Sequence, residues 1–121
     1  DFTRSSTRSW WGDLFRPFVE LGVAGIWNDM NEPAVFETPN GTMPLDVRHD
    51  DDGRATDHRE IHNVWGMLMS RGTHEGLARH APDVRPFVLT RASFAGGHRY
   101  AAVWTGDNVS DWIHLKVGLP M

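Results

Sequence analysis

Two aspartates stand where a carboxylate can do chemistry. Asp29 follows the apolar run 23–27, and Asp107 follows a second apolar run that ends at Trp104. Runs of this length are typical of buried parallel strands, and in α/β folds the chemistry collects at the carboxyl ends of such strands. Two carboxyl groups facing each other across a sugar can hydrolyse a glycosidic bond, one as nucleophile and one as proton donor. The alternative is that each aspartate only caps the helix that follows its strand.

Glu32 competes with Asp29 for the role of nucleophile. Successive side chains of a strand alternate between its two faces. This alternation places Trp27, Asp29 and Asn31 on one face and Glu32 on the other, so Asp29 and Glu32 are not expected to point inward together unless the alternation fails past the end of the strand. Trp27 beside Asp29 gives the more economical site, because the indole then lies next to the reacting sugar.

Arg91 ends a further apolar segment, residues 85–91. A guanidinium is always charged and offers a fork of donors that suits hydroxyl groups and carboxylates. Arg91 is therefore expected to orient Asp107 or to bind a sugar hydroxyl. A structural salt bridge at the rim is the alternative for Arg91, and a place in the core is the alternative for Trp104.

The elements that must position these residues follow from the hydrophobic periodicity. It predicts helices over residues 5–21, from 57 to no further than 82, and from 112 onward, and strands over 23–27, 85–91 and 101–104. Ser5 or Ser6 is expected to cap the first helix, which Pro17 should kink. Asp57 and Glu60 form a capping box for the second helix.

The order of the elements predicts a parallel sheet. No hairpin dipeptide joins the apolar runs, and right-handed crossovers bring all three carboxyl ends to one side. Residues 33–57 are polar and rich in turn formers. A loop of this length directly after the first strand is expected to form a wall of the pocket.

The composition excludes several classes of partner. The 121 residues carry a net charge of −4, which gives no electrostatic reason to expect a nucleic acid or an anionic membrane as partner. No apolar stretch is long enough to span a membrane. The lack of cysteine slightly favours a reducing, cytoplasmic compartment. Six tryptophans offer flat faces for a core or for sugar rings.

No cofactor and no metal are expected. The acidic run 49–53 lacks the alternating ligands and the distal glutamate of a calcium loop, so a solvated turn is favoured. With no cysteine in the chain, no zinc site is assigned to the seven histidines. His62 is expected to be a hydrogen-bonded packing residue, and His98 a loop residue.

Two segments resemble the signatures of a known family. GIWNDMNEP at 25–33 resembles the nucleophile segment of the α-glucosidases of glycoside hydrolase family 31. RASFAGGHRYAAVWTGDN at 91–108 resembles the acid/base segment of the same family. The resemblance covers nearly the whole chain, and two long motifs in the right order are far more specific than one short motif.

This resemblance implies an α/β fold, a (β/α)8 TIM barrel, of which residues 1–121 hold about three central parallel strands with their helices as a fragment of one catalytic domain. It implies a retaining α-glucosidase that hydrolyses terminal α-linked glucose in an α-glucoside or α-glucan oligosaccharide. Asp29 matches the nucleophile and Asp107 the acid/base. The positions that line the subsite of the terminal glucose are matched by Trp27, Met30, Arg91 and Trp104.

Two alternative functions stay open. One is an α-transglucosidase or another α-glycosidase of the same family. The other is a non-catalytic carbohydrate-binding module that uses the tryptophan faces. Three strands leave open edges and uncovered apolar faces, and a barrel takes about 250 residues. Residues 1–121 alone are therefore expected neither to fold stably nor to hydrolyse glycosides.

Overall fold

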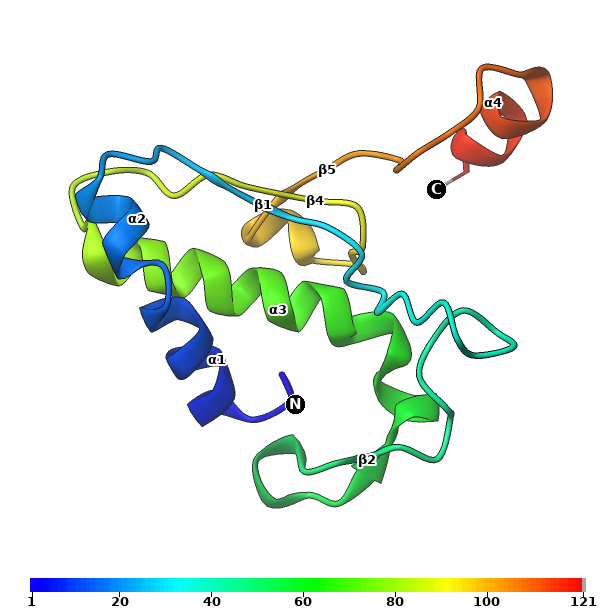
Figure 1. Ribbon diagram of the computed structural model, residues 1–121, viewed down its shortest axis with the longest axis horizontal. Helices are drawn as coiled ribbons and strands as arrows, with labels where there is room; N and C mark the ends of the chain where they lie inside the picture. Colours follow the sequence, from blue (N-terminus) through cyan, green and yellow to red (C-terminus); the bar gives the residue numbers. More distant parts are fainter. Residues whose placement is uncertain (121) are drawn as a thin grey trace.

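Three parallel strands form the sheet that carries the predicted site (Figure 1). In the computed structural model, which describes residues 1–120, these strands are β1 (Ile26–Asn28), β4 (Val88–Thr90) and β5 (Ala102–Val103). They lie in the order β1-β4-β5, with Asn28 opposite Thr90 and Leu89 opposite Ala102. The predicted parallel arrangement is confirmed, and the three carboxyl ends meet at one edge.

Each strand is shorter than predicted. The first was expected at residues 23–27, but pairing starts only at Ile26 and continues to Asn28. Within the described residues β1 and β5 each have a single neighbour, because β4 lies between them. A strand is assigned only where its backbone pairs with a neighbouring strand. The register begins with Ile26 opposite Val88, the first residue of β4, so residues 23–25 have no strand opposite them.

Helix α3 (His58–His80) lies between the sheet and helix α1 (Ser5–Asp13), as Figure 1 shows. A short helix, α2 (Arg16–Glu20), follows α1 and also contacts α3. The predicted helix over 5–21 is thus broken, with Pro17 in the first turn of α2, where its missing N–H costs no hydrogen bond. The core consists of Leu77, Val88 and Ala101, packed against Phe15, Val19 and Ile26.

The buried face of α3 is made largely of small residues. Its large apolar residues at helical spacing differ in burial: Ile61 and Trp65 are buried, whereas Val64, Leu68 and Met69 are only partly buried. Glycines occupy the closest contacts. A Cβ on Gly76 would lie 2.5 Å from the Gly12 carbonyl oxygen, and one on Gly66 would lie 2.7 Å from the Ala92 carbonyl oxygen. The absence of side chains there lets α1 and the end of β4 approach α3 closely.

The helix starts differ in part from their predicted caps. Neither Ser5 nor Ser6 is the N-cap residue of α1, and Ser5 instead donates from its backbone N and its Oγ to Asp52 Oδ1, at 2.7 and 2.9 Å. Asp57 caps α3 by accepting from the backbone N of Arg59 at 3.0 Å. Glu60 does not complete the capping box, because its carboxylate binds Thr56 and Arg54.

The long segment between β1 and α3 contains a small antiparallel pair, β2 (Arg48–His49) and β3 (Thr56–Asp57), around the 3-10 turn η1 (Asp51–Gly53). A second 3-10 turn, η2 (Gly97–Arg99), precedes β5. The last helix, α4 (Trp112–Gly118), is capped by Asp111 and stands apart from the other elements in Figure 1. None of the helices within residues 1–120 is long and apolar enough to cross a membrane.

Candidate active site

Asp29 lies one residue beyond β1, between two buried asparagines. Asn28 and Asn31 are 2 % and 3 % exposed, and both make hydrogen bonds inside the fold. The Asp29 side chain itself is 27 % exposed. Its Oδ1 is shielded from solvent and accepts no hydrogen bond from the described residues. The charged group nearest to this oxygen among the ion pairs of Asp29 is the Arg91 guanidinium, whose Nε lies 3.3 Å away.

The expected alternation of side chains fails immediately after the strand. Met30 has φ 52°, in the left-handed region, so the pleat of β1 ends there. As a result Asp29 and Glu32 both face Arg91, and the prediction that they would lie on opposite faces is wrong. The period of two applies only while the backbone is extended, and residues 29–32 lie outside the strand.

Arg91, one residue beyond β4, joins three carboxylates. Its Nε donates to Glu32 Oε1 at 2.8 Å and lies 3.3 Å from Asp29 Oδ1. Its Nη1 lies 3.5 Å from Asp107 Oδ2. The hydrogen bond to Glu32, with the charges of the three carboxylates, raises the pKa of the Arg91 guanidinium. One permanent cation thus holds the two predicted catalytic carboxylates, together with Glu32, in one place.

Asp107 reaches this cluster from β5, which lies on the opposite side of β4 from β1. It follows β5 by four residues, directly after Gly106, whose φ of 80° suits glycine. The Asp107 side chain is 87 % exposed, much more than that of Asp29. The two carboxylates therefore share a partner but differ in exposure.

The two predicted tryptophans form an aromatic pair beside the carboxylates. The ring centroids of Trp27 and Trp104 are 5.8 Å apart, with 56° between the ring planes. Trp27 is exposed on the sheet, and Trp104 is half-buried. Exposed indoles of this kind offer apolar faces on which a sugar ring can stack. Met30, also exposed, lies next to Asp29 in the chain and can add to the same wall.

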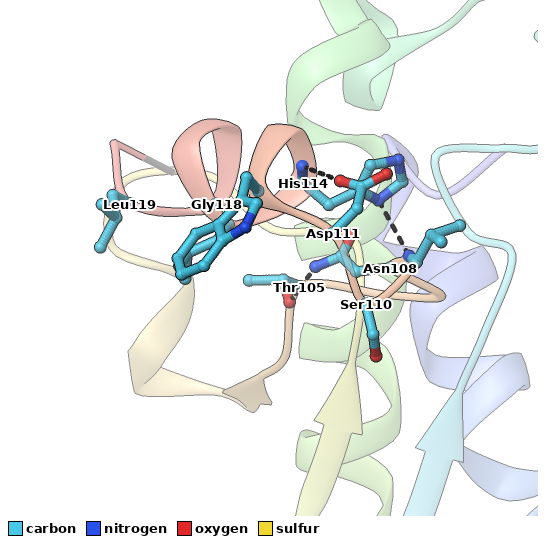
Figure 2. Close-up of a pocket in the computed structure, with 10 residues that line it drawn as sticks. Thr105, Asn108, Ser110, Asp111, His114, Gly118 and Leu119 are labelled. Carbon is cyan, nitrogen blue, oxygen red and sulfur yellow. Dashed lines mark hydrogen bonds between the residues drawn. The ribbon is translucent and has the colours of Figure 1, made fainter.

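The hollow near the end of the chain does not contain the carboxylate cluster. It measures about 770 Å³ and is lined by residues of α4, by residues 108–111 and by Thr105 and Leu119 (Figure 2). Asn108 donates to Thr105 inside it at 2.6 Å, and the backbone N of His114 donates to Asp111 at 2.7 Å. These polar groups form hydrogen bonds with each other, so the hollow adds no catalytic group to the site.

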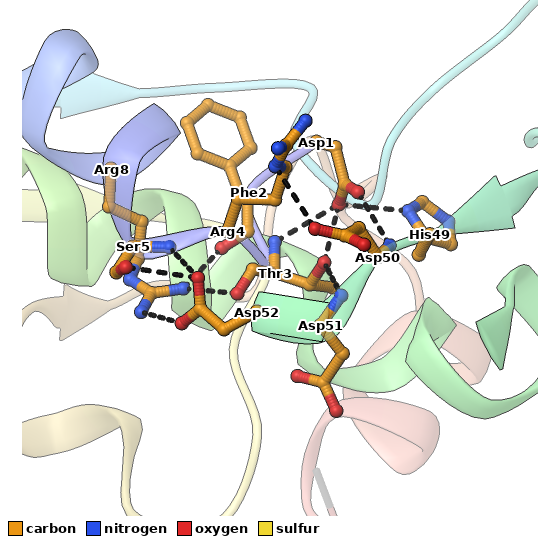
Figure 3. Close-up of polar contacts among 10 residues, drawn as sticks. All are labelled: Asp1, Phe2, Thr3, Arg4, Ser5, Arg8, His49, Asp50, Asp51 and Asp52. Carbon is orange, nitrogen blue, oxygen red and sulfur yellow. Dashed lines mark hydrogen bonds and ion pairs between the residues drawn. The ribbon is translucent and has the colours of Figure 1, made fainter. Parts of the chain in front are cut away.

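The acidic run after β2 forms the expected solvated turn, and its carboxylates also bind the start of the chain (Figure 3). Asp50 pairs with Arg4 at 3.2 Å, and Asp52 lies 3.6 Å from Arg8 Nη2. The hydrogen bonds of Asp52 with Ser5 lower the pKa of the Asp52 carboxyl. Within residues 1–120 no group of histidine and acidic side chains could hold a metal ion.

Three histidines form a chain behind the loop. His49 Nε2 lies 3.1 Å from His58 Nδ1, and His58 Nε2 lies 3.1 Å from His62 Nδ1. At its other end His49 Nδ1 lies 3.1 Å from Asp1 Oδ1. Three neutral rings can each donate from Nδ1 and accept at Nε2, which satisfies every contact. His62 is hydrogen-bonded as predicted, and its four-residue spacing from His58 is the sequence signal for the contact.

This histidine chain should make stability depend on pH. Burial lowers the pKa of His49 and His58 below the usual 6.5; neighbouring imidazoles lower that of His58 further, and Asp57 opposes both shifts. Below pH 6.5 the unfolded chain then binds more protons than the folded one, so the free energy of unfolding falls as the pH drops. The contribution of the two histidines to this free energy is fully present above pH 6.5. The urea midpoint of the full-length protein should therefore be lower at pH 5.5 than at pH 7.5.

Replacement of one ring tests this expectation. His58→Gln should lower the midpoint at pH 7.5 and reduce the difference between the two pH values, because glutamine does not titrate. His98→Gln, at an exposed position, serves as the matched control and should leave that difference unchanged. An equal pH dependence in wild type and His58→Gln would contradict the expectation.

Comparison with known proteins gives consistent matches over the whole chain. Residues 1–121 match the family described as the glycosyl hydrolases family 31 TIM-barrel domain. The chain is 52 % identical to alpha-glucosidase 2 of Bacillus thermoamyloliquefaciens over 121 residues, which are all of this chain and 15 % of that protein. It is 46 % identical to neutral alpha-glucosidase AB of Sus scrofa over 125 aligned positions, covering all of this chain and 13 % of that protein.

Solved structures of alpha-glucosidases also match this chain. A family 31 alpha-glucosidase from Bacteroides thetaiotaomicron superposes with a TM-score of 0.75 at 46 % identity, covering 99 % of this chain and 18 % of the other. A glucosidase II alpha subunit, described as alpha3-Glc2-bound, gives a TM-score of 0.81 at 43 % identity, covering 99 % and 13 %. The chain therefore spans less than a fifth of the length of these relatives.

Proposed function

Because this chain belongs to the family 31 glycosyl hydrolases, we propose that it forms the catalytic centre of a retaining α-glucosidase. Residues 1–121 would be one part of a single catalytic (β/α)8 barrel, with the remaining strands supplied by the rest of the protein. The observation that carries the proposal is the contact of Asp29 and Asp107 with the same guanidinium, that of Arg91.

In the first step the ionised Asp29 attacks the anomeric carbon of a terminal α-linked glucose. The glycosidic bond breaks, and Asp107 gives its proton to the departing oxygen. In the second step water attacks the anomeric carbon of the glucosyl-enzyme and loses a proton to Asp107, so that glucose leaves with retained configuration.

Arg91 supports the first step. Its positive charge stabilises the negative charge of Asp29 before the attack, since the two groups are 3.3 Å apart. Its hydrogen bond with Glu32 keeps the guanidinium oriented, because a paired fork has little rotational freedom. Trp27, Trp104 and Met30 would supply the apolar wall for the glucose ring. The substrate is an α-glucoside or an α-glucan oligosaccharide, consistent with the relative whose bound ligand is described as alpha3-Glc2.

Turnover and product stereochemistry test this function. The full-length protein should hydrolyse a nitrophenyl α-glucoside, and proton NMR of the early products should show α-glucose before mutarotation. β-Glucose as the first product would indicate inversion and contradict the double displacement. A non-catalytic carbohydrate-binding module predicts binding without any hydrolysis, and a transglucosidase predicts glucose transfer to a sugar acceptor instead of water.

A further inference from the structure

A buried contact joins the two segments that carry Asp29 and Arg91. Asn31 follows Asp29 by two residues, and Thr90 directly precedes Arg91. Asn31 Nδ2 donates to Thr90 Oγ1 at 3.0 Å, and Thr90 Oγ1 lies 3.1 Å from Asn31 Oδ1. Asn31 is 3 % exposed and Thr90 is not exposed at all. Water therefore does not compete for this contact.

The Thr90 hydroxyl also holds the residue after Arg91. It accepts from the backbone N of Ala92 at 3.3 Å and lies 3.2 Å from the Ala92 carbonyl oxygen. A hydroxyl has two acceptor positions and one hydrogen. Asn31 and Ala92 fill both acceptor positions, and the hydrogen can go to either of their carbonyl oxygens. One oxygen atom thus ties Asn31 to the residues on both sides of Arg91.

This contact begins where the backbone pairing ends. The register of β1 and β4 stops at Asn28 opposite Thr90. Among the backbone hydrogen bonds of residues 1–120, none joins residues 29–32 to residues 91–92. Met30 turns the chain out of the extended conformation at the same point. The side chains of Asn31 and Thr90 therefore continue the connection between the two strand ends beyond their last backbone pair.

We propose that Asn31 and Thr90 are a positioning pair, which holds Asp29 and Glu32 at their contact distances from Arg91. The assignment of a catalytic task to these distances rests on the proposed glucosidase function. Neither member of the pair reaches a substrate, because both side chains are buried. Their effect passes through the position of the Asp29 carboxylate, where a displacement of about 1 Å can cost roughly 100-fold in rate.

A similar contact on the other flank of Asp29 provides a matched control. Thr73 of α3 is as fully buried as Thr90. Its hydroxyl accepts from Asn28 Nδ2 at 3.0 Å and from Trp11 Nε1 at 2.8 Å. This contact joins β1 to the helices and does not touch the strand of Arg91. Loss of the Thr73 hydroxyl should therefore lower stability without separating Asp29 from Arg91.

The test compares these hydroxyls in the full-length enzyme. Thr90→Val keeps the shape of the side chain and should lower kcat by about 10- to 100-fold, with KM changed less than about threefold. Thr90→Ser keeps the hydroxyl and should restore most of kcat. Thr73→Val should lower Tm but keep kcat within about threefold of wild type. Asn31→Ala tests the same contact from its other side, in case Thr90→Val fails to fold.

A crystal structure of Thr90→Val gives a readout that does not need activity. The Asp29 Oδ1 to Arg91 Nε distance, 3.3 Å in the wild type, should increase. An unchanged distance would overturn the positioning role even if the protein proved inactive on glucosides. Equal losses of kcat in Thr90→Val and Thr73→Val, or a loss expressed only in KM, would also overturn it. A wild type without glucosidase activity would contradict the proposed function and leave the distance test intact.

Discussion

Asp29→Asn in the full-length enzyme is expected to lower kcat by roughly 10⁴-fold or more, the scale observed when a covalent nucleophile is removed. Asparagine fills the same space beside Arg91 but lacks the negative charge, and its neutral amide oxygen is too weak a nucleophile to form the glucosyl ester. The Asp29 carboxylate, which is 27 % exposed and lies 3.3 Å from Arg91 Nε, is the group whose loss should matter. Steady-state hydrolysis of a nitrophenyl α-glucoside measures the effect.

Covalent labelling decides between Asp29 and Glu32. A fluorinated glucosyl fluoride should label the wild type on Asp29, as found by peptide mapping, and should not label Asp29→Asn. Glu32→Gln is the matched control, because Glu32 faces the same guanidinium. This variant should have a lower catalytic rate but should still be labelled on Asp29. A label on Glu32 would reverse the two assignments.

Gly76→Ala should destabilise the full-length protein by roughly 1–2 kcal/mol. An alanine in a helix interior is favoured over glycine by up to about 1 kcal/mol. Against this gain, the new Cβ would lie 2.5 Å from the Gly12 carbonyl oxygen and 2.7 Å from the Gly12 carbonyl carbon. These are backbone atoms of α1, so a side-chain rotation cannot relieve the overlap, and overpacking costs about 1–3 kcal/mol or more. Urea denaturation or the shift in Tm measures the loss.

Gly72→Ala is the graded control for this packing. Gly72 lies one turn earlier on the same helix and also faces α1. There the nearest atoms to a new Cβ are the backbone of Arg8 at 3.2 and 3.3 Å, so a shift of a few tenths of an ångström suffices. The loss should be clearly smaller than for Gly76→Ala. Equal losses for the two variants would show that distance to α1 does not control the cost.

The sheet could be predicted from the sequence because its signal is local. The three strand positions end in a polar residue, and the connections contain a helix or a long loop, which leaves parallel pairing as the simple solution. The convergence of Asp29, Arg91 and Asp107 follows from that topology, and the structure brings all three together.

The remaining contacts depend on features that periodicity does not report. A left-handed backbone at Met30 turned Glu32 toward Arg91, against the expected alternation. The glycines of α3 mark a close helix contact that a search for apolar stripes overlooks. The capping of α1 comes from Asp52, 47 residues away, and no local pattern points to a partner at that distance.

The loop after β1 has two parts that differ in how well they can tolerate insertions, because only one of them is anchored through the acidic run. Residues 48–58 are tied to the chain start, through Asp1, Thr3 and Ser5, and to the first turn of α3. Residues 34–42 are held mainly by turns within themselves. An insertion in 34–42 can be accommodated without loosening a helix, whereas one in 48–58 would uncap α1. Changes in loop length during evolution should therefore concentrate in residues 34–42.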